Sequence, residues 1–152
     1  DKIAKGEGGK RLNPNKLCTR AEMLTFLWRS LGCPDPVGTG KSFTDVPSGA
    51  YYTKAVQWAA SLKIVKGEGG KRFNPDATVT RAEAITFLYR ALGVPSSAAG
   101  RFTDVPASAY YAEAVEWAAE HDIAKGMGKR SFSPASPCTR AQVLTFLYRS
   151  QS

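Results

Sequence analysis

One four-residue motif occurs three times in this sequence, and the repetition limits what the chain can fold into. Thr-Arg-Ala-Glu occurs at residues 19–22 and 80–83, and Thr-Arg-Ala-Gln occurs at 139–142. Each copy opens an apolar run: MLTFLWRSL, AITFLYRAL and VLTFLYRSQ. Self-similarity at a fixed period is typical of repeat architectures, in which neighbouring copies bury a shared core. The sequence therefore predicts that equivalent units pack against one another.

The spacing of the copies defines the repeats and indicates that the first repeat is incomplete. Thr80 and Thr139 are 59 residues apart, whereas Thr19 and Thr80 are 61 apart because the first linker is two residues longer. The first copy contains only the second half of the repeat. The predicted units are a partial first repeat (1–32), a second repeat (43–93) and a third repeat (102–152). With 152 residues in total, we expect these units to form one compact domain.

Each complete repeat is predicted to contain two helices separated by a glycine-rich loop. Apolar residues recur at helical spacing from Tyr51 to Leu62, and the pattern returns from Tyr110 to His121. The loops KGEGGKRFNP and KGMGKRSFSP follow. A second helical pattern then begins at each Thr-Arg-Ala-Glu/Gln motif. The sequence thus predicts an all-α fold of tandem helix–loop–helix repeats.

The threonine and the glutamate or glutamine of the motif form a capping box at a helix start. The arginines Arg20, Arg81 and Arg140 are not explained by capping. They fall at the first helical position, where the helix dipole disfavours a cation by ~0.3–1 kcal/mol. Two explanations remain open: a structural salt bridge to a nearby carboxylate, or an anion site that combines the guanidinium with free helix amides.

The loop residues Lys66 and Gly67 recur as Lys125 and Gly126. Neither loop has the spacing of a P-loop or of a dinucleotide-binding fingerprint, so a nucleotide-phosphate site has little support. A helix C-cap followed by a turn is the favoured explanation of the glycines, and a binding role stays open for them. The lysines are the stronger candidates for binding.

The tryptophans Trp58 and Trp117 lie on the apolar face of the first helix, which favours a place in the core. An indole can also stack on a sugar while its other side packs inward, so a binding role stays open. The sequence predicts no enzyme activity and no cofactor. Its single histidine, His121, has no Cys/His cluster beside it, and no Ser/His/Asp set or carboxylate pair recurs.

The net charge of +8 and a pI near 9.6 indicate an anionic partner such as nucleic acid, an acidic glycan or an anionic membrane. No apolar run approaches the ~18 residues that a membrane span needs, and no signal peptide is visible. Nucleic acid is disfavoured because no predicted helix gathers several basic or amide residues on one exposed face. A helical scaffold for protein–protein interaction is the other alternative.

The ordered set FTDVP, YY-x-x-AV-x-WA, the I-x-KG-x-G loop, the F-x-P step and TRAE before FLYRAL resembles the S-layer homology family over essentially the whole chain. The resemblance implies a pseudo-threefold helical spindle. It also implies an extracellular module at the bacterial cell wall. Such modules anchor surface proteins non-covalently to secondary cell-wall polymers, often carrying pyruvylated N-acetylmannosamine, in grooves between neighbouring copies.

The resemblance also implies which residues bind the polymer. The key arginine is that of TRAE, and a pyruvyl carboxylate would supply the anion that it needs. The implied ligand-binding residues are Arg20, Arg81, Arg140, Trp58, Trp117, Asp45, Asp104, Lys66, Lys125, Gly67 and Gly126. The sequence departs from the family pattern at Gln142, which replaces the glutamate, and in the first copy, which lacks its first helix.

Only two copies bring a first helix with a Tyr/Ala/Trp face. Three such helices around an axis would bury those faces together, so a vacant third position would expose aromatic surface. We therefore expect the position to be filled by a helix from another chain, a swapped element or, as the leading expectation, a preceding segment that has been removed.

Cys18 and Cys138 occupy the same repeat position, which Val79 fills in the middle copy. The exchange predicts buried thiols that act as small apolar groups. At equivalent points of a pseudo-threefold assembly, their Cα atoms are expected to lie well beyond the ~7 Å that a disulfide tolerates.

Overall fold

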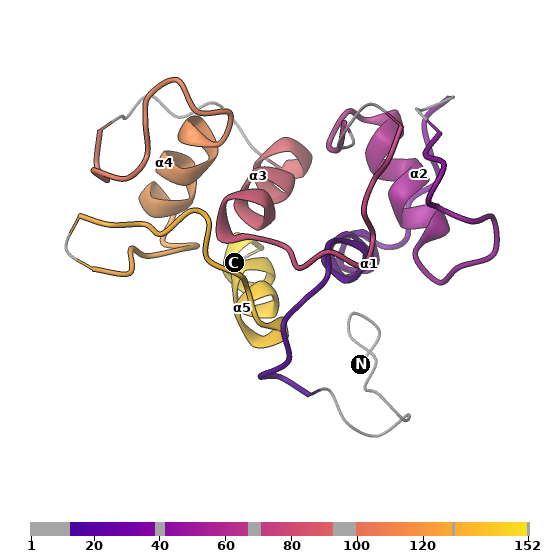
Figure 1. Ribbon diagram of the computed structural model, residues 1–152, viewed down its shortest axis with the longest axis horizontal. Helices are drawn as coiled ribbons and strands as arrows, with labels where there is room; N and C mark the ends of the chain where they lie inside the picture. The colour runs from indigo at the N-terminus through magenta and orange to yellow at the C-terminus, as the bar shows by residue number, and fades with distance from the viewer. Residues whose placement is uncertain (1–12, 39–41, 67–70, 93–99, 129, 152) are drawn as a thin grey trace.

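The computed structural model describes residues 13–38, 42–66, 71–92, 100–128 and 130–151. Within these ranges the chain forms five helices and no strand, only three isolated bridges. The helices are α1 (Arg20–Ser30), α2 (Thr53–Ser61), α3 (Arg81–Leu92), α4 (Ala112–Glu120) and α5 (Arg140–Ser150) (Figure 1). The predicted all-α fold of helical repeats is confirmed. The repeat bounds remain predictions, and most of the partial first loop, residues 1–12, lies outside the described residues.

Helices α1, α3 and α5 begin at the repeated motif because its side chains cap them, as predicted. In α1, Thr19 Oγ1 accepts a hydrogen bond from the Glu22 amide at 3.0 Å, and Glu22 Oε1 accepts from the Thr19 amide at 2.9 Å. The same reciprocal pair forms in α3. Gln142 replaces the glutamate in α5 and keeps both bonds. Each such cap stabilises its helix by ~1 kcal/mol.

The residues just before these helices form a closed ring of backbone hydrogen bonds. The Cys18 amide donates to the Cys138 carbonyl at 2.8 Å, the Cys138 amide to Val79 at 3.0 Å, and the Val79 amide to Cys18 at 2.9 Å. Helices α1, α3 and α5 also contact one another behind this ring. The three copies are thus arranged around a pseudo-threefold axis, because each gives one bond and receives one.

The first helices of the repeats do not gather around that axis, so this expectation is wrong. Helix α2 packs on α1 and α4 packs on α3, each against the preceding copy, and they lie on opposite sides of the molecule (Figure 1). The second helices take the centre because they bury a broader surface. In α1, for example, Met23, Leu24, Phe26 and Leu27 are all buried. The apolar residues of all five helices form one continuous core.

Cys18 and Cys138 are buried free thiols, as predicted, but the reason given for their not pairing is wrong. Their backbones are joined directly by the hydrogen bond between the Cys18 amide and the Cys138 carbonyl. Equivalent positions in a threefold assembly are far apart only when they lie away from the axis. These two residues lie next to the axis, in the ring of backbone hydrogen bonds.

Candidate functional site

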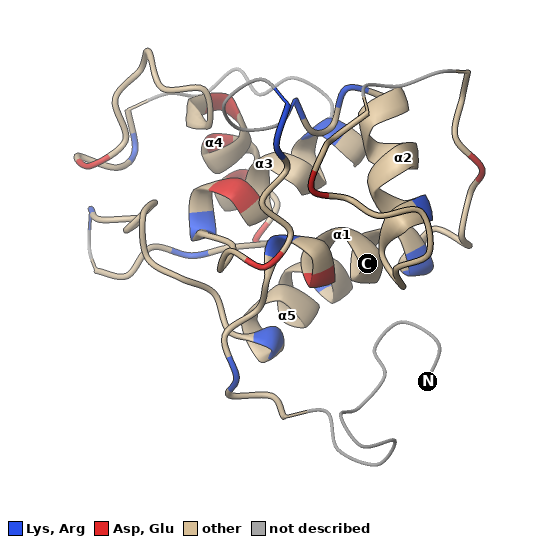
Figure 2. Cartoon of the chain, turned by 45° about the vertical axis from the view of Figure 1, so that its right-hand side comes forward, with Lys and Arg blue, Asp and Glu red and all other residues tan. Residues whose placement is uncertain are grey.

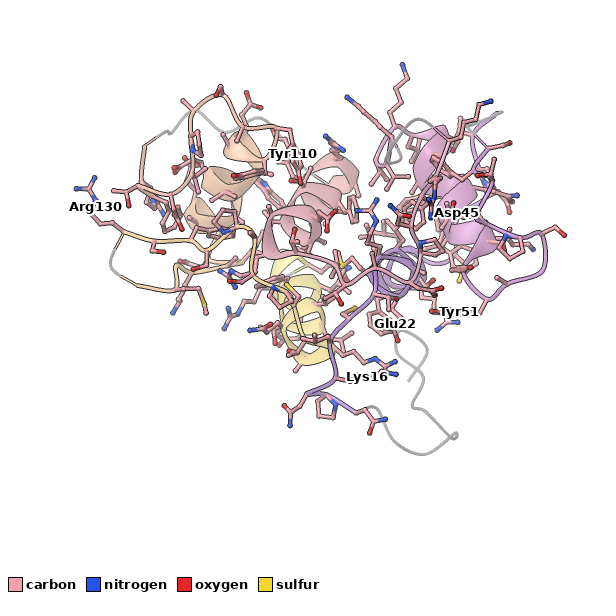
Figure 3. The ribbon with its side chains drawn as sticks, in the orientation of Figure 1. Lys16, Glu22, Asp45, Tyr51, Tyr110 and Arg130 are labelled. Atoms are coloured by element: carbon pink, nitrogen blue, oxygen red, sulfur yellow. The ribbon has the colours of Figure 1, made fainter. Side chains whose placement is uncertain are left out.

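Two grooves with equivalent linings run between the repeats. The first, called here the α1 groove, has a volume of about 410 Å³ and is lined by Glu22, Thr25, Phe26, Arg29, Tyr51 and Arg140. The second, the α3 groove, has a volume of about 330 Å³ and is lined by Arg20, Val65, Lys66, Glu83, Phe87, Arg90 and Tyr110. Figure 3 shows Glu22 and Tyr51 near one another at α1, with Tyr110 near α3. Each groove takes residues from all three repeats, so neither exists in a single copy.

The motif arginines are almost fully buried, and two of them, Arg140 and Arg20, reach the α1 and α3 grooves from the neighbouring copy. Arg20, Arg81 and Arg140 are 4%, 4% and 5% exposed. Arg20 Nε donates to the Phe73 carbonyl at 2.9 Å, and its Nη1 forms an ion pair with Glu83. Its guanidinium also stacks over the Phe73 ring, 4.8 Å from the centroid. Arg140 forms the corresponding ion pair with Glu22. Of the two explanations that the sequence left open, the structural salt bridge is therefore present for Arg20 and Arg140.

The first amides of these helices are not available to a ligand. The Arg20 amide donates to the Ala77 carbonyl at 2.8 Å, and the Ala21 amide donates to Pro75 at 3.0 Å. The corresponding amides of α3 donate to carbonyls of the third copy, and those of α5 donate to carbonyls of the first copy. The third amide of each helix is bonded to the capping threonine. An anion site built on free helix amides is therefore wrong for this chain.

Arg81 differs from the other two because Gln142 stands where its glutamate partner would be. Its Nε donates to the Phe132 carbonyl at 2.9 Å and its Nη2 to the Lys125 carbonyl at 2.8 Å. No carboxylate in the described part of the chain forms an ion pair with it. Burial lowers the pKa of the Arg81 guanidinium, although an arginine stays charged at neutral pH. Among the residues that the structure describes, this buried positive charge is bonded only to neutral carbonyl groups.

The aspartates Asp45 and Asp104 hold the loop between the two helices of a repeat. Asp45 Oδ1 and Oδ2 accept from the Phe73 and Asn74 amides at 2.8 and 2.7 Å. Asp104 accepts from the equivalent amides of Phe132 and Ser133 at the same distances. Burial alone would raise both pKa values, but these backbone donors outweigh it and lower them. Neither aspartate lines a groove, and Figure 3 shows Asp45 beside α2.

The lysines and glycines of the two loops have different roles in the structure. Lys66 is exposed and lines the α3 groove. Lys125 contributes its backbone carbonyl to Arg81, as described above. At Gly126 an added Cβ would lie 2.6 Å from the Ser131 carbonyl oxygen and 2.8 Å from the Phe102 ring, so glycine is required by space. Gly67 lies outside the described residues.

Trp58 and Trp117 are buried in the core and line neither groove. Trp117 packs edge-on against Tyr89 with 5.5 Å between the ring centroids, which joins α4 to α3. The grooves instead use Tyr51 and Tyr110, which are exposed, although the sequence pattern assigned them to the apolar face.

Sequence reasoning also missed the groove arginines Arg29 and Arg90. The signal available was their recurrence in the runs FLWRSL and FLYRAL, at a position that core packing does not require. Arg90 Nη1 donates to the Ile64 carbonyl at 2.9 Å, which fixes the side chain along the groove wall.

Basic and acidic residues are distributed over helices and connecting segments alike (Figure 2). No helix of the described residues is long and apolar enough to cross a membrane. The same residues contain no cluster of three or more His, Cys, Asp or Glu side chains that could hold a metal ion.

Comparison with known proteins identifies the repeats. The family model of the S-layer homology domain matches residues 1–24, 42–85 and 101–144. A cell surface protein of Thermoanaerobacter kivui is 36% identical over 113 residues, covering 70% of this chain and 15% of that protein. An amylopullulanase of Thermoanaerobacterium thermosulfurigenes is 31% identical over 153 residues, covering 96% of the chain and 8% of that protein.

The surface-layer 125 kDa protein of Lysinibacillus sphaericus is 31% identical over 113 residues, covering 74% of the chain and 10% of that protein. The chain thus spans only a small part of the length of these relatives. The names of these relatives describe different kinds of protein. The chain belongs to the S-layer homology family, whose members are found at the bacterial cell surface.

Proposed function

We propose that this chain anchors a larger protein to the bacterial cell wall by binding an anionic, pyruvylated secondary cell-wall polysaccharide in the grooves between its repeats. A surface-layer protein and an amylopullulanase carry a similar segment that makes up a small fraction of each. A segment shared by proteins so different in name is better explained by a common location than by a common reaction.

The observation that carries the proposal is that the chain builds the same groove twice. Each groove combines a buried arginine–glutamate pair, a second arginine on the wall and an exposed tyrosine at the rim. In the α3 groove, three cations (Arg20, Lys66 and Arg90) face one carboxylate, Glu83. The excess positive charge suits an anionic ligand.

The groups present match the parts of a pyruvylated sugar. A guanidinium or ammonium group can bind the pyruvyl carboxylate through charge-assisted hydrogen bonds. A tyrosine ring can lie against the apolar face of a sugar while its hydroxyl bonds to the ring substituents. Partial burial raises the pKa of the Tyr51 and Tyr110 hydroxyl groups, and the nearby carboxylates of Glu22 and Glu83 raise it further. Both tyrosine hydroxyls therefore stay protonated at neutral pH and can donate hydrogen bonds.

The deciding experiment is sedimentation of the purified chain with cell-wall sacculi before and after chemical extraction of the secondary polymer. We expect binding that is lost on extraction and is weakened by the double variant Tyr51→Ala/Tyr110→Ala. Tyr148→Ala is the matched control, because Tyr148 is also exposed but lines neither groove. Equal binding to extracted sacculi would instead favour the protein–protein scaffold.

The motif arginines are a second test of the same proposal. Arg81→Ala and Arg140→Ala are expected to weaken wall binding by about tenfold or more, since a charge-assisted contact contributes ~1.5–3 kcal/mol. Lysine at these positions should not restore binding, because it lacks the planar fork. Both arginines also bond across repeats, so binding must be measured at a temperature where each variant remains folded.

A further inference from the structure

One peptide group in the loop of the second repeat lies between two charged side chains from distant parts of the sequence. This group joins Phe73 to Asn74. Its N–H donates to Asp45 Oδ2 at 2.7 Å, and its carbonyl oxygen accepts from Arg20 Nε at 2.9 Å. Asp45 Oδ1 also accepts from the Phe73 amide at 2.8 Å. The peptide group therefore connects a carboxylate on one side to a guanidinium on the other.

The third repeat builds the same arrangement with the same geometry. The peptide group between Phe132 and Ser133 donates its N–H to Asp104 Oδ2 at 2.7 Å and accepts from Arg81 Nε at 2.9 Å. In both repeats the residue that supplies this N–H is left-handed, with φ of 59° at Asn74 and 60° at Ser133. Residues other than glycine rarely adopt this conformation, so its recurrence with two different side chains indicates that the aspartate holds it in place.

The aromatic ring of Phe73 adds a second contact to the same arginine. The Arg20 guanidinium stacks over this ring, and Phe73 is fully buried. One residue thus fixes the guanidinium twice, through its ring and through its carbonyl oxygen. Because an arginine side chain is long and flexible, its donors face a groove in a constant direction only when such contacts hold them.

We propose that Asp45 is a positioning residue of the α3 groove. It lines neither groove, but it holds the peptide group before Asn74 and thereby the Arg20 guanidinium at the groove wall. Asp104 holds Arg81 in the same way. The aspartates that the family resemblance assigned to ligand binding thus act through another residue. The effect on ligand binding rests on the proposed function, whereas the effect on the arginine does not.

Charge makes this series of bonds stronger than a series of neutral hydrogen bonds. Hydrogen bonds to ionised groups are shorter and stronger than neutral ones, and consecutive bonds polarise one another. A carboxylate that accepts from the N–H makes the carbonyl oxygen of the same peptide group a better acceptor for the guanidinium. An amide in place of the carboxylate therefore weakens the bond to Arg20 even where the loop keeps its shape. Asp45→Asn makes this change without removing the side chain.

The first test follows the arginines of the free chain by NMR. Hydrogen exchange of each arginine Nε–H group reports whether its bond to the loop carbonyl is kept. We expect Asp45→Asn to raise the exchange rate of the Arg20 Nε–H by about tenfold and to leave that of Arg81 unchanged. Asp104→Asn should do the reverse, so each variant is the matched control of the other. Unchanged exchange of Arg20 in Asp45→Asn would overturn the proposal.

The second test measures sedimentation with cell-wall sacculi. Asp45→Asn should weaken binding by about threefold to tenfold, the range expected for one weakened hydrogen bond. Asp35→Asn should bind normally, because it removes the same charge from an exposed linker residue that lines neither groove. In an Arg20→Lys background, in which the α1 groove remains, Asp45→Asn should cause no further loss, because lysine lacks the guanidinium Nε–H. A full additional loss there would mean that Asp45 acts by another route and would overturn the proposal.

Failure of this proposal can be told apart from failure of the proposed function. If the native chain does not sediment with sacculi, the proposed function is wrong, while the exchange rates still decide whether Asp45 positions Arg20. If the native chain sediments and Asp45→Asn sediments equally well despite faster Arg20 exchange, the position of the arginine does not control binding. That result would overturn the role of Asp45 in the α3 groove and leave the proposed function intact.

Discussion

The ion pair between Arg20 and Glu83 links two repeats, and a single substitution can remove it without disturbing the helix cap. In Glu83→Gln the amide oxygen can still accept from the Thr80 amide, as Gln142 does from the Thr139 amide at 2.8 Å. The remaining NH₂ group then faces the donors of Arg20. The arginine is left in the interior of the molecule without its carboxylate.

The size of the effect follows from burial and from the bonds that remain. The side chains of Arg20 and Glu83 are 5% and 15% exposed. Breaking a fully buried pair by removing one partner costs ~3–5 kcal/mol. The cost here should be smaller, because Arg20 keeps its bond to the Phe73 carbonyl and its contact with the Phe73 ring. We expect a loss of about 1–3 kcal/mol in the free energy of unfolding.

Urea unfolding measures this loss, and the chain offers its own reverse control. Glu83→Gln should lower the denaturation midpoint with an unchanged m-value. Gln142→Glu should raise the midpoint, because it places a carboxylate at the position facing Arg81. The reasoning is refuted if Glu83→Gln leaves the midpoint unchanged, or if both variants shift it in the same direction.

Three further predictions concern the loop aspartates, the thiols and a glycine. Folding lowers the pKa of Asp104. Asp104 therefore stabilises the fold fully at pH values above its unfolded pKa of about 4, and this contribution is lost as the pH falls through the lower pKa of the folded chain. The stability difference between the native chain and Asp104→Asn should therefore shrink from pH 7 to pH 2 in urea titrations, and a constant difference would contradict this. Exposed Cys33 should react rapidly with a thiol reagent, whereas Cys18 and Cys138 react only on unfolding, since burial raises the Cys138 pKa to about 11. A Cys18–Cys138 disulfide in a non-reducing peptide map would refute this. Gly126→Ala should destabilise the chain by about 1–3 kcal/mol, because the added Cβ would approach backbone at 2.6 Å, whereas Gly49→Ala has open space around it and should be tolerated.

The residues of the candidate site were only partly predictable from the sequence. The motif arginines were identified because a cation at the first helical position conflicts with the helix dipole, which is a local property. Tyr51 and Tyr110 were not identified as groove residues, because their side chains face a cleft formed with the preceding copy. Trp58 and Trp117 were named as candidates because an indole can stack on a sugar, but in the fold both indoles are buried in the core. Asp45 and Asp104 proved to bind backbone amides some 28 residues away, beyond the reach of any local pattern.

The sequence by itself determined the helices, where three of them begin, and the number of copies. These follow from periodicity and capping, which depend on residues within a few positions of one another. Tertiary structure alone decided that the second helices occupy the axis and that α2 and α4 pack on the preceding copy. It also decided that Cys18 and Cys138 meet, because the hydrogen-bonded ring joins residues more than a hundred positions apart. Whether a helix face is buried likewise depends on which element packs beside it, as buried Thr25 in α1 and Thr86 in α3 illustrate.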